Sequence, residues 1–288
     1  MSLAFLETAL RRALGDETVQ VQAASAVGGG CIHETARLRT TAGEFFAKWN
    51  AACPPDLFLR EAFGLDSLRA AGSEIVIPAV VAASAPAGSG PAFLVLEYLP
   101  PDTGRPEDER LGRGLATIHR RSAERFGFSA PSYCGATRQD NRACDDWLTF
   151  YRDRRLGTLV DALRLGAADR NLYQRLFDRL PNLLPSESPP ALIHGDLWSG
   201  NVLATARGPA LVDPACAFAD REMEFGIATL FGGLSARALA AYEEAWPLPA
   251  GWRERNPLYQ LYHLLNHALL FGGRYAAEAR RIAVRFAG

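Results

Sequence analysis

The first hundred residues alternate between short apolar runs with a strand-like period and two helical stretches. Leucines recur at helical spacing over residues 3–14, and a second apolar stripe covers about 56–71. Runs rich in β-branched and aromatic residues predict strands at 18–24, 32–38, 44–49, 75–77, 80–81 and 93–99. The last of these ends at Pro100 and Pro101, which cannot donate to a sheet ladder. We therefore predict a mostly β N-terminal lobe over residues 1–100.

The remaining residues, 101–288, place their apolar side chains mainly at helical spacing. The pattern predicts helices at 107–121, 144–156, 158–165, 170–183, 222–231, 235–245, 256–271 and 274–286. A polar stretch at 194–201 interrupts them, and two short apolar strands follow it at 202–204 and 210–212. The sequence therefore predicts an α+β chain with a small β-rich N-terminal lobe and a mostly helical C-terminal lobe.

The composition is that of a globular protein without a nucleic-acid partner. Of its 288 residues, 48% are hydrophobic and 22% are charged, which favours a packed core over disorder. The net charge of −1 provides no overall positive field for a polyanion. Basic residues do gather late in the chain, but at the helical spacing of a solvated face, at Arg274, Arg280, Arg281 and Arg285. The sequence leaves the oligomeric state open.

The cysteines and the short apolar runs predict a cytoplasmic chain that does not enter a membrane. The cysteines are odd in number and include no C-x-x-C pair; they stand at Cys31, Cys53, Cys134, Cys144 and Cys216. This favours free thiols in a reducing compartment over a disulfide framework or a zinc site. No apolar run approaches the roughly 18 residues of a membrane helix. Residues 3–14 lack the basic start of a signal peptide.

Three polar residues at the ends of apolar segments form the strongest chemical signal. Asp196 follows the apolar residues 192–193, Asn201 lies five positions later, and Asp213 ends the second short strand. Protein kinases use this spacing for a catalytic Asp, a metal-binding Asn and a second metal-binding Asp. Carboxylate and amide oxygens are also the ligands that Mg²⁺ prefers. We therefore predict Asp196 as the catalytic base and Asn201 and Asp213 as Mg²⁺ ligands.

Two backbone segments of the N-terminal lobe are suited to hold a nucleotide. Consecutive glycines cost roughly 1 kcal/mol each in regular structure relative to alanine, so they indicate a sharp turn or a close approach to a ligand. The glycines that could cover phosphates are Gly28, Gly29 and Gly30. An ordinary hairpin turn is the alternative. The residues after the strongest strand could present backbone groups to adenine; they are Glu97, Tyr98 and Leu99.

A lysine and a glutamate of the same lobe are predicted to pair. Lys48 lies in the strand 44–49 among aromatic and small residues, where a buried ammonium needs a counter-charge. Glu61 lies on the apolar stripe of the following helix, three residues after Phe58 and four before Leu65. We expect Glu61 to hold Lys48 toward the α- and β-phosphates of ATP. The alternative is a partly exposed Glu61 at the edge of the stripe.

These groups follow one another along the chain in the order found in kinases: glycines, Lys, Glu, the adenine-facing hinge at 97–99, Asp, Asn and Asp. This order predicts a protein-kinase-like bilobal fold that binds ATP and Mg²⁺. Two departures argue against a protein kinase. Gly195 gives His-Gly-Asp in place of His-Arg-Asp, and Pro214 follows Asp213 in place of Phe. There is also no Ala-Pro-Glu element. These departures favour phosphorylation of a small molecule.

The motifs resemble those of the fructosamine kinase (ketosamine-3-kinase) family, in the superfamily of aminoglycoside phosphotransferases and choline kinases. The residues that carry the resemblance are His194 to Asn201, Gly28 to Ile32, Phe58 to Leu65, Asp220 to Glu222 and Phe231 to Gly233. The resemblance implies ATP-dependent phosphorylation of the 3-hydroxyl of a ketosamine on a free amino acid or a protein. The product ester is labile, so the reaction would free the amine and repair glycation.

Three further residues are candidates at the same site. Trp198 lies two positions after Asp196 and could form a wall for the sugar, with a core tryptophan as the alternative. His194 is a second candidate substrate contact. Cys31 lies in the predicted phosphate loop, where a thiol near Lys48 could be redox-sensitive or simply a small turn residue.

Two other functions stay open on the residues alone. One is a kinase of the aminoglycoside or choline type, whose polycationic aminoglycoside acceptors would call for an acidic cleft. The other is a non-catalytic ATP-binding protein, which usually lacks one of the residues Lys48, Asp196 and Asp213; all three are present. The sequence does not separate ribulosyl, fructosyl and erythrulosyl acceptors.

Overall fold

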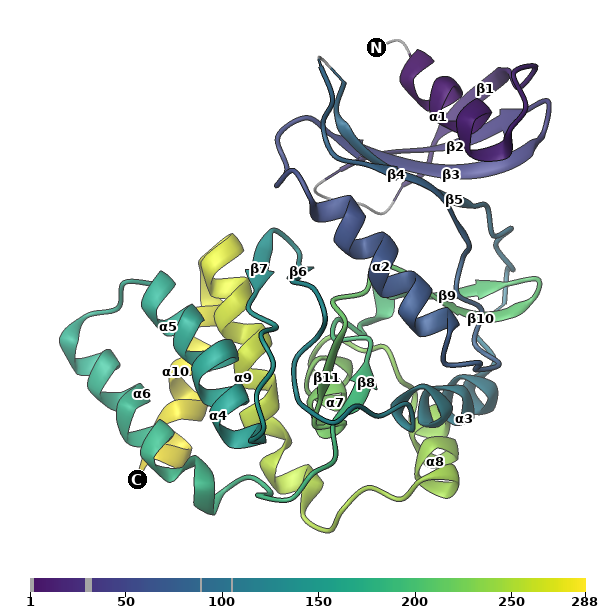
Figure 1. The fold of residues 1–288 in the computed structure, drawn as a ribbon. Helices are drawn as coiled ribbons and strands as arrows, with labels where there is room; N and C mark the ends of the chain where they lie inside the picture. The colour runs from purple at the N-terminus through teal and green to yellow at the C-terminus, as the bar shows by residue number, and fades with distance from the viewer. Residues whose placement is uncertain (1–2, 29–32, 89, 105) are drawn as a thin grey trace.

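An antiparallel five-stranded sheet with a helix on each face forms one end of the molecule (Figure 1). The computed structural model describes residues 3–28, 33–88, 90–104 and 106–288. The strands are β1 (Val21–Ala26), β2 (Glu34–Thr40), β3 (Gly43–Asn50), β4 (Val80–Ser84) and β5 (Ala92–Glu97), in the spatial order β1-β2-β3-β5-β4. The first strand begins later than predicted, because residues before it form a turn in which Thr18 N–H donates to the Asp16 carboxylate at 2.8 Å.

The alternation of side chains along the central strands separates two cores. Val95 of β5 is buried with α1 (Ala4–Leu14), whereas its neighbour Leu94 is buried on the opposite face with α2 (Leu57–Arg69). Successive strand side chains point to opposite faces of a sheet. The same alternation in β3 places Lys48 on the side of α2. The sheet therefore delivers its lysine to the face that looks toward the rest of the chain.

Helices form most of the remaining chain (Figure 1). They are α3 (Asp108–His119), α4 (Trp147–Tyr151), α5 (Thr158–Ala162), α6 (Ala167–Arg179), α7 (Glu222–Leu230), α8 (Ala236–Ala245), α9 (Trp252–Phe271) and α10 (Arg274–Ala287). The helices α5, α7 and α10 pack on α9, whereas α3 and α8 pack on each other. A π-helical turn, Arg152–Gly157, joins α4 to α5, so the two predicted helices there form one continuous run. Over the described part of the chain, no helix is long and apolar enough to cross a membrane.

The long helix α9 begins at Trp252, not at residue 256 as predicted. The earlier start is stabilised by packing: Trp252 is 6% exposed, and its ring lies 5.7 Å from that of Phe225. Tertiary contact thus adds a turn before the predicted start, and Pro257 lies inside the helix.

The other strands of the described residues form two-stranded pairs outside the five-stranded sheet. The predicted hairpin is present as β9 (Val202–Thr205) and β10 (Gly208–Leu211). Two further pairs were not predicted: β6 (Ser132–Cys134) with β7 (Thr137–Gln139), and β8 (Ala191–Ile193) with β11 (Ala217–Ala219).

The predicted strand at 75–77 does not join the five-stranded sheet. Val76 instead bridges to the β9–β10 hairpin: its N–H donates to Pro209 O at 2.9 Å, and Leu211 N–H donates to Val76 O at 3.0 Å. Its neighbours Ile75 and Ile77 are buried in the α2 core. The segment therefore ties the N-terminal sheet region to the hairpin that carries Asp213.

Candidate active site

The loop that carries Asp196 is shaped by a glycine and by a buried glutamate. The buried strand β8 delivers the chain to Gly195, whose φ of +81° lies in the left-handed region. A Cβ at Gly195 would lie 2.3 Å from Ala215 O, so the close crossing of the two segments requires glycine. Glu224 of α7 accepts the N–H groups of His194 at 2.5 Å and of Gly195 at 2.9 Å. This carboxylate fixes the backbone immediately before Asp196.

His194 lies beneath this loop and does not face the cleft. Its side chain is fully buried, its Nε2 lies 2.9 Å from Val212 O, and Asp196 N–H donates to its Nδ1 at 3.3 Å. The ring thus joins the strand end before Asp213 to the backbone of Asp196. This position differs from the predicted substrate contact, because both ring nitrogens are occupied by backbone partners of the site.

Asp196, Asn201 and Asp213 come together as the spacing predicts. Asn201 follows Asp196 in a short 3₁₀ turn (Ser199–Asn201) and is 4% exposed. Its Nδ2 donates to Asp196 Oδ2 at 3.2 Å and lies 3.5 Å from Asp213 O. Asp213 has a φ of +56°, an unusual conformation for a non-glycine residue, and its side chain is 54% exposed. The left-handed turn directs that carboxylate away from the hairpin and toward Lys48.

Lys48 is buried and forms ion pairs with Glu61 and Asp213. Its Nζ lies 2.6 Å from Glu61 Oε1 and 2.6 Å from Asp213 Oδ1. The structure thus contains the predicted Lys48–Glu61 pair. Burial opposes the charge on Lys48, but the carboxylates of Asp213 and Glu61 outweigh it and raise the lysine pKa above its usual range. Burial raises the pKa of Glu61 to about 7, against the opposing effect of Lys48.

The predicted nucleotide segments lie in part at the cleft. Gly28 lines the cleft, whereas Gly29, Gly30 and Cys31 lie outside the described residues. The hinge residues Glu97, Tyr98 and Leu99 also line it.

Side-chain contacts hold the hinge in place. The Glu97 carboxylate lies 2.7 Å from Arg207 of the β9–β10 hairpin and accepts Ala79 N–H at 3.1 Å. The Arg37 guanidinium lies 4.5 Å from the centre of the Tyr98 ring. These contacts fix the path of the chain between the sheet and the helices.

The cleft has a volume of about 880 Å³, within the range of small-molecule sites. On the side of α9 and α10 its wall is largely aromatic and includes Trp198, Phe231, His267, Phe271 and Tyr275. Trp198 is 38% exposed, which excludes the alternative of a core tryptophan. Its ring lies over Gly200, where a Cβ would come within 2.3 Å of it. The indole is therefore a surface of the cleft beside Asp196.

Asp196 has surroundings suited to a base near neutral pH. Burial raises its pKa to about 7, and the charge of Asp213 acts in the same direction. The hydrogen bond from Asn201 opposes this shift by favouring the carboxylate. The other carboxylate oxygen, Oδ1, accepts a long hydrogen bond of 3.8 Å from the Cys134 thiol.

Sequence patterns did not reveal several groups that shape this site. Glu224, Cys134 and His263 come from separate helices and strands, and each reaches the Asp196 loop only through the fold. The sequence offered one signal, a carboxylate at Glu224 within a largely apolar predicted helix; in the structure every residue from Glu222 to Ala228 of that helix is buried. A carboxylate in such a helix requires partners.

The fold and the cluster of Lys48, Asp196, Asn201 and Asp213 define a phosphotransferase with a protein-kinase-like fold. The solved structure of a choline kinase from Streptococcus pneumoniae superposes with a TM-score of 0.63 at 14% identity, covering 99% of this chain and 98% of that one. At this identity the likeness establishes the fold alone.

The chain belongs to the fructosamine kinase family, whose model matches residues 6–286. It is 34% identical over 273 residues to a chloroplastic protein-ribulosamine 3-kinase of Oryza sativa subsp. indica, covering 92% of this chain and 79% of that protein. A solved structure from Thermobifida fusca, assigned as a fructosamine-3-kinase, superposes with a TM-score of 0.85 at 32% identity. That match covers 99% of this chain and 100% of the other.

Proposed function

We propose that the protein is an ATP-dependent kinase that phosphorylates the 3-hydroxyl of ketosamines, the adducts of sugars with amines. The observation that carries the proposal is the position of Asp196, which lies beside Asn201 at the aromatic side of the cleft in a member of the fructosamine kinase family. The ribulosamine 3-kinase among its relatives supports a ketosamine acceptor. Phosphorylation would then lead to deglycation of the amine.

Lys48 is proposed to contact the α- and β-phosphates of ATP, with Glu61 holding its ammonium in place. The support is the 2.6 Å contact between the two side chains at the cleft. Gly28 would face the phosphates from the glycine segment, and the predicted roles of Gly29 and Gly30 stay predictions. The backbone at 97–99 would face adenine.

Asn201 and Asp213 provide donors that fit Mg²⁺. Both offer hard oxygen atoms, and the Asp213 carboxylate is half exposed at the cleft beside Lys48. The Asn201 amide donates through Nδ2 to Asp196, which leaves Oδ1 as the acceptor end of the group. When bound, Mg²⁺ would offset the charge of the phosphates. The two side chains would hold the ion, while Lys48 binds phosphate oxygens directly.

Asp196 is proposed to orient the acceptor hydroxyl and to accept its proton as phosphoryl transfer proceeds. A base acts best when its pKa lies near the working pH, and burial raises the pKa of Asp196 to about 7. Glu224 and His194 would hold the loop so that the carboxylate keeps one geometry. Preorganisation of this kind is the main contribution of the protein to phosphoryl transfer.

The charges of the cleft favour a ketosamine over a polycationic aminoglycoside. Among the described lining residues, four are carboxylates: Glu61, Glu97, Asp196 and Asp213. Three of these already face a cation of the protein, namely Lys48 or Arg207. The aromatic wall adds no further acidic groups, and Trp198 presents a flat face suited to a sugar ring.

The proposal is tested by replacing Asp196 with asparagine and measuring ATP consumption with ribulosyl-lysine. We expect turnover to fall by about 10²–10⁴-fold, the usual contribution of a general base, while Mg-ATP binding measured by calorimetry is retained. Asp145→Asn is a matched control, because that side chain is 81% exposed. Near-normal turnover in Asp196→Asn would contradict the assigned role.

A further inference from the structure

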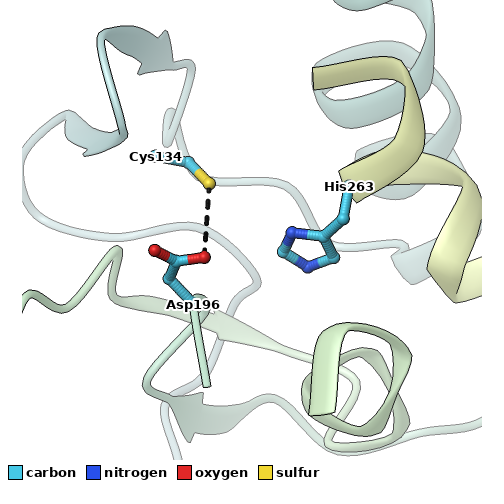
Figure 2. Close-up of side chains that lie close together, drawn as sticks. All are labelled: Cys134, Asp196 and His263. Carbon is cyan, nitrogen blue, oxygen red and sulfur yellow. Dashed lines mark hydrogen bonds between the residues drawn. The ribbon is translucent and has the colours of Figure 1, made fainter. Parts of the chain in front are cut away.

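Two side chains from distant parts of the sequence, a cysteine and a histidine, lie close to the Asp196 carboxylate (Figure 2). Cys134 comes from β6, Asp196 from the loop after β8, and His263 from α9. One sulfur, one oxygen and one nitrogen atom of these residues lie within 4.8 Å of one another. Figure 2 shows the imidazole facing the gap between the thiol and the carboxylate. Sulfur, imidazole and carboxylate ligands together are typical of a zinc site.

His263 supplies the second, independent sign of a ligand site. Its side chain is 1% exposed, and neither ring nitrogen has a hydrogen-bond partner among the described residues. A buried polar group without a partner is costly, so it calls for an explanation. Burial lowers the pKa of His263 to about 3, so the imidazole is neutral and retains a lone pair for a cation. The proposed phosphotransfer mechanism gives this residue no role.

The two oxygens of Asp196 face different partners. Oδ2 accepts from Asn201 on the side of the proposed Mg²⁺ ligands, whereas Oδ1 lies 3.8 Å from the Cys134 sulfur. With zinc bond lengths of about 2.3 Å to sulfur and about 2.0–2.2 Å to oxygen, a sulfur and an oxygen ligand of a tetrahedral site lie roughly 3.5–3.7 Å apart. The observed sulfur–oxygen distance would contract by only a few tenths of an ångström. Cys134 and Asp196 also line the cleft, which provides an entry path.

We propose that Cys134, Asp196 and His263 form a binding site for a soft divalent cation of the zinc type, and that the bound cation inhibits the kinase. Cys134 would bind as a thiolate and release its proton to solvent. Oδ1 of Asp196 would then coordinate the cation and withdraw negative charge from the carboxylate, so Asp196 would become a much weaker base toward the substrate hydroxyl. Mg²⁺ would not compete well, because it disfavours sulfur ligands.

The site is built for reversible binding. It offers three protein ligands, which leaves a fourth position for water or for a group in the cleft. The second nitrogen of His263 has no described partner, whereas zinc-bound imidazoles of high-affinity sites usually donate from that nitrogen. Asn266 steadies the thiol side by donating to Cys134 O at 3.2 Å. The cation would therefore act as a reversible inhibitor.

Cobalt binding tests the site directly. Co²⁺ is added to the purified protein, and the thiolate-to-cobalt charge-transfer band is recorded for the parent, Cys134→Ser and Cys144→Ser. Cys144 is a matched control, since its thiol lies elsewhere and contacts Asp146 O. We expect the band in the parent and Cys144→Ser, and its loss in Cys134→Ser. A parent without the band, or a Cys134→Ser variant that keeps it, would overturn the proposal.

A second experiment tests whether the bound cation inhibits the kinase. This experiment rests on the proposed function, whereas the cobalt experiment is independent of it. Free Zn²⁺ is set with a chelating buffer at saturating Mg-ATP, and each rate is normalised to the zinc-free rate of the same variant. The half-inhibiting concentration should rise at least about 10-fold in Cys134→Ser and His263→Phe, and stay unchanged in Cys144→Ser. Equal midpoints in the parent and Cys134→Ser would overturn the inhibition. A cobalt band without ketosamine turnover would contradict the proposed function alone.

Discussion

Replacing Gly195 with alanine tests whether the close crossing of the catalytic loop over Ala215 fixes the position of Asp196. Gly195 has a φ of +81°, and its position allows the loop to cross the backbone at Ala215. The added methyl would lie 2.3 Å from Ala215 O, a separation that neither segment can keep. Ala215 N–H also donates to His194 O at 2.8 Å, so any displacement strains a second link between the segments.

The size of the effect follows from two separate costs. The left-handed conformation costs an L-residue roughly 1–2 kcal/mol. Forcing a methyl into a packed crossing adds about 1–3 kcal/mol, so the total loss of stability is about 2–5 kcal/mol. Relieving the overlap moves the loop by about 1 Å, and a misplacement of that size costs on the order of 10²-fold in rate. Asp196, the next residue, would move with the loop.

Gly15→Ala provides a matched control. Gly15 has a φ of +66°, but nothing lies within 4 Å of the position its Cβ would take. This variant should lose only the roughly 1–2 kcal/mol of conformational strain and keep its kcat/KM. Urea unfolding measures the stability of both variants, and ATP consumption with ribulosyl-lysine measures kcat/KM. If kcat/KM of Gly195→Ala stays within about 3-fold of that of Gly15→Ala, the proposed link between this crossing and Asp196 is wrong.

Two further predictions concern buried groups. Lys48→Met should raise the KM for ATP by about 10–100-fold, because a hydrogen bond to a charged group contributes about 1.5–3 kcal/mol. An unchanged KM for ATP in steady-state kinetics would exclude phosphate binding by Lys48. Between pH 7 and pH 5, the free energy of unfolding of the parent should fall by about 2 kcal/mol more than that of His263→Phe. Burial lowers the pKa of His263 from 6.5 to about 3 in the folded protein, so across this range only the unfolded chain takes up the proton. If urea unfolding shows that the parent and His263→Phe lose the same free energy of unfolding between pH 7 and pH 5, His263 is instead an imidazolium paired with Asp196.

Local patterns predicted those parts of the site whose residues lie close in sequence or on a periodic element. The apolar stripe of α2 placed Glu61 toward the core, where it meets Lys48 at 2.6 Å. The five-residue spacing brought Asn201 to Asp196, and the end of a short strand placed Asp213 beside them. The ketosamine acceptor rested on a family resemblance, and the match to the family over residues 6–286 confirms that resemblance.

Groups that meet only through tertiary packing could not be predicted in this way. The short pair β6–β7 has no strong strand signal, yet it brings Cys134 to Asp196. Cysteine spacing argued against a zinc site, because it tests only ligands that are near in sequence. The third residue of the proposed site, His263, lies on α9, more than a hundred residues after Cys134. His194 illustrates the opposite limit, since its place in the motif did not reveal that its ring lies below the cleft.

The central claim is tested most directly by comparing acceptors in one assay. ADP release is measured with ribulosyl-lysine, fructosyl-lysine, an aminoglycoside and choline at the same concentration, with Asp196→Asn as the background. Our account predicts ADP release with a ketosamine, recovery of a phosphorylated sugar adduct, and no release above background with the aminoglycoside or choline. Turnover of the aminoglycoside or choline without turnover of either ketosamine would contradict it.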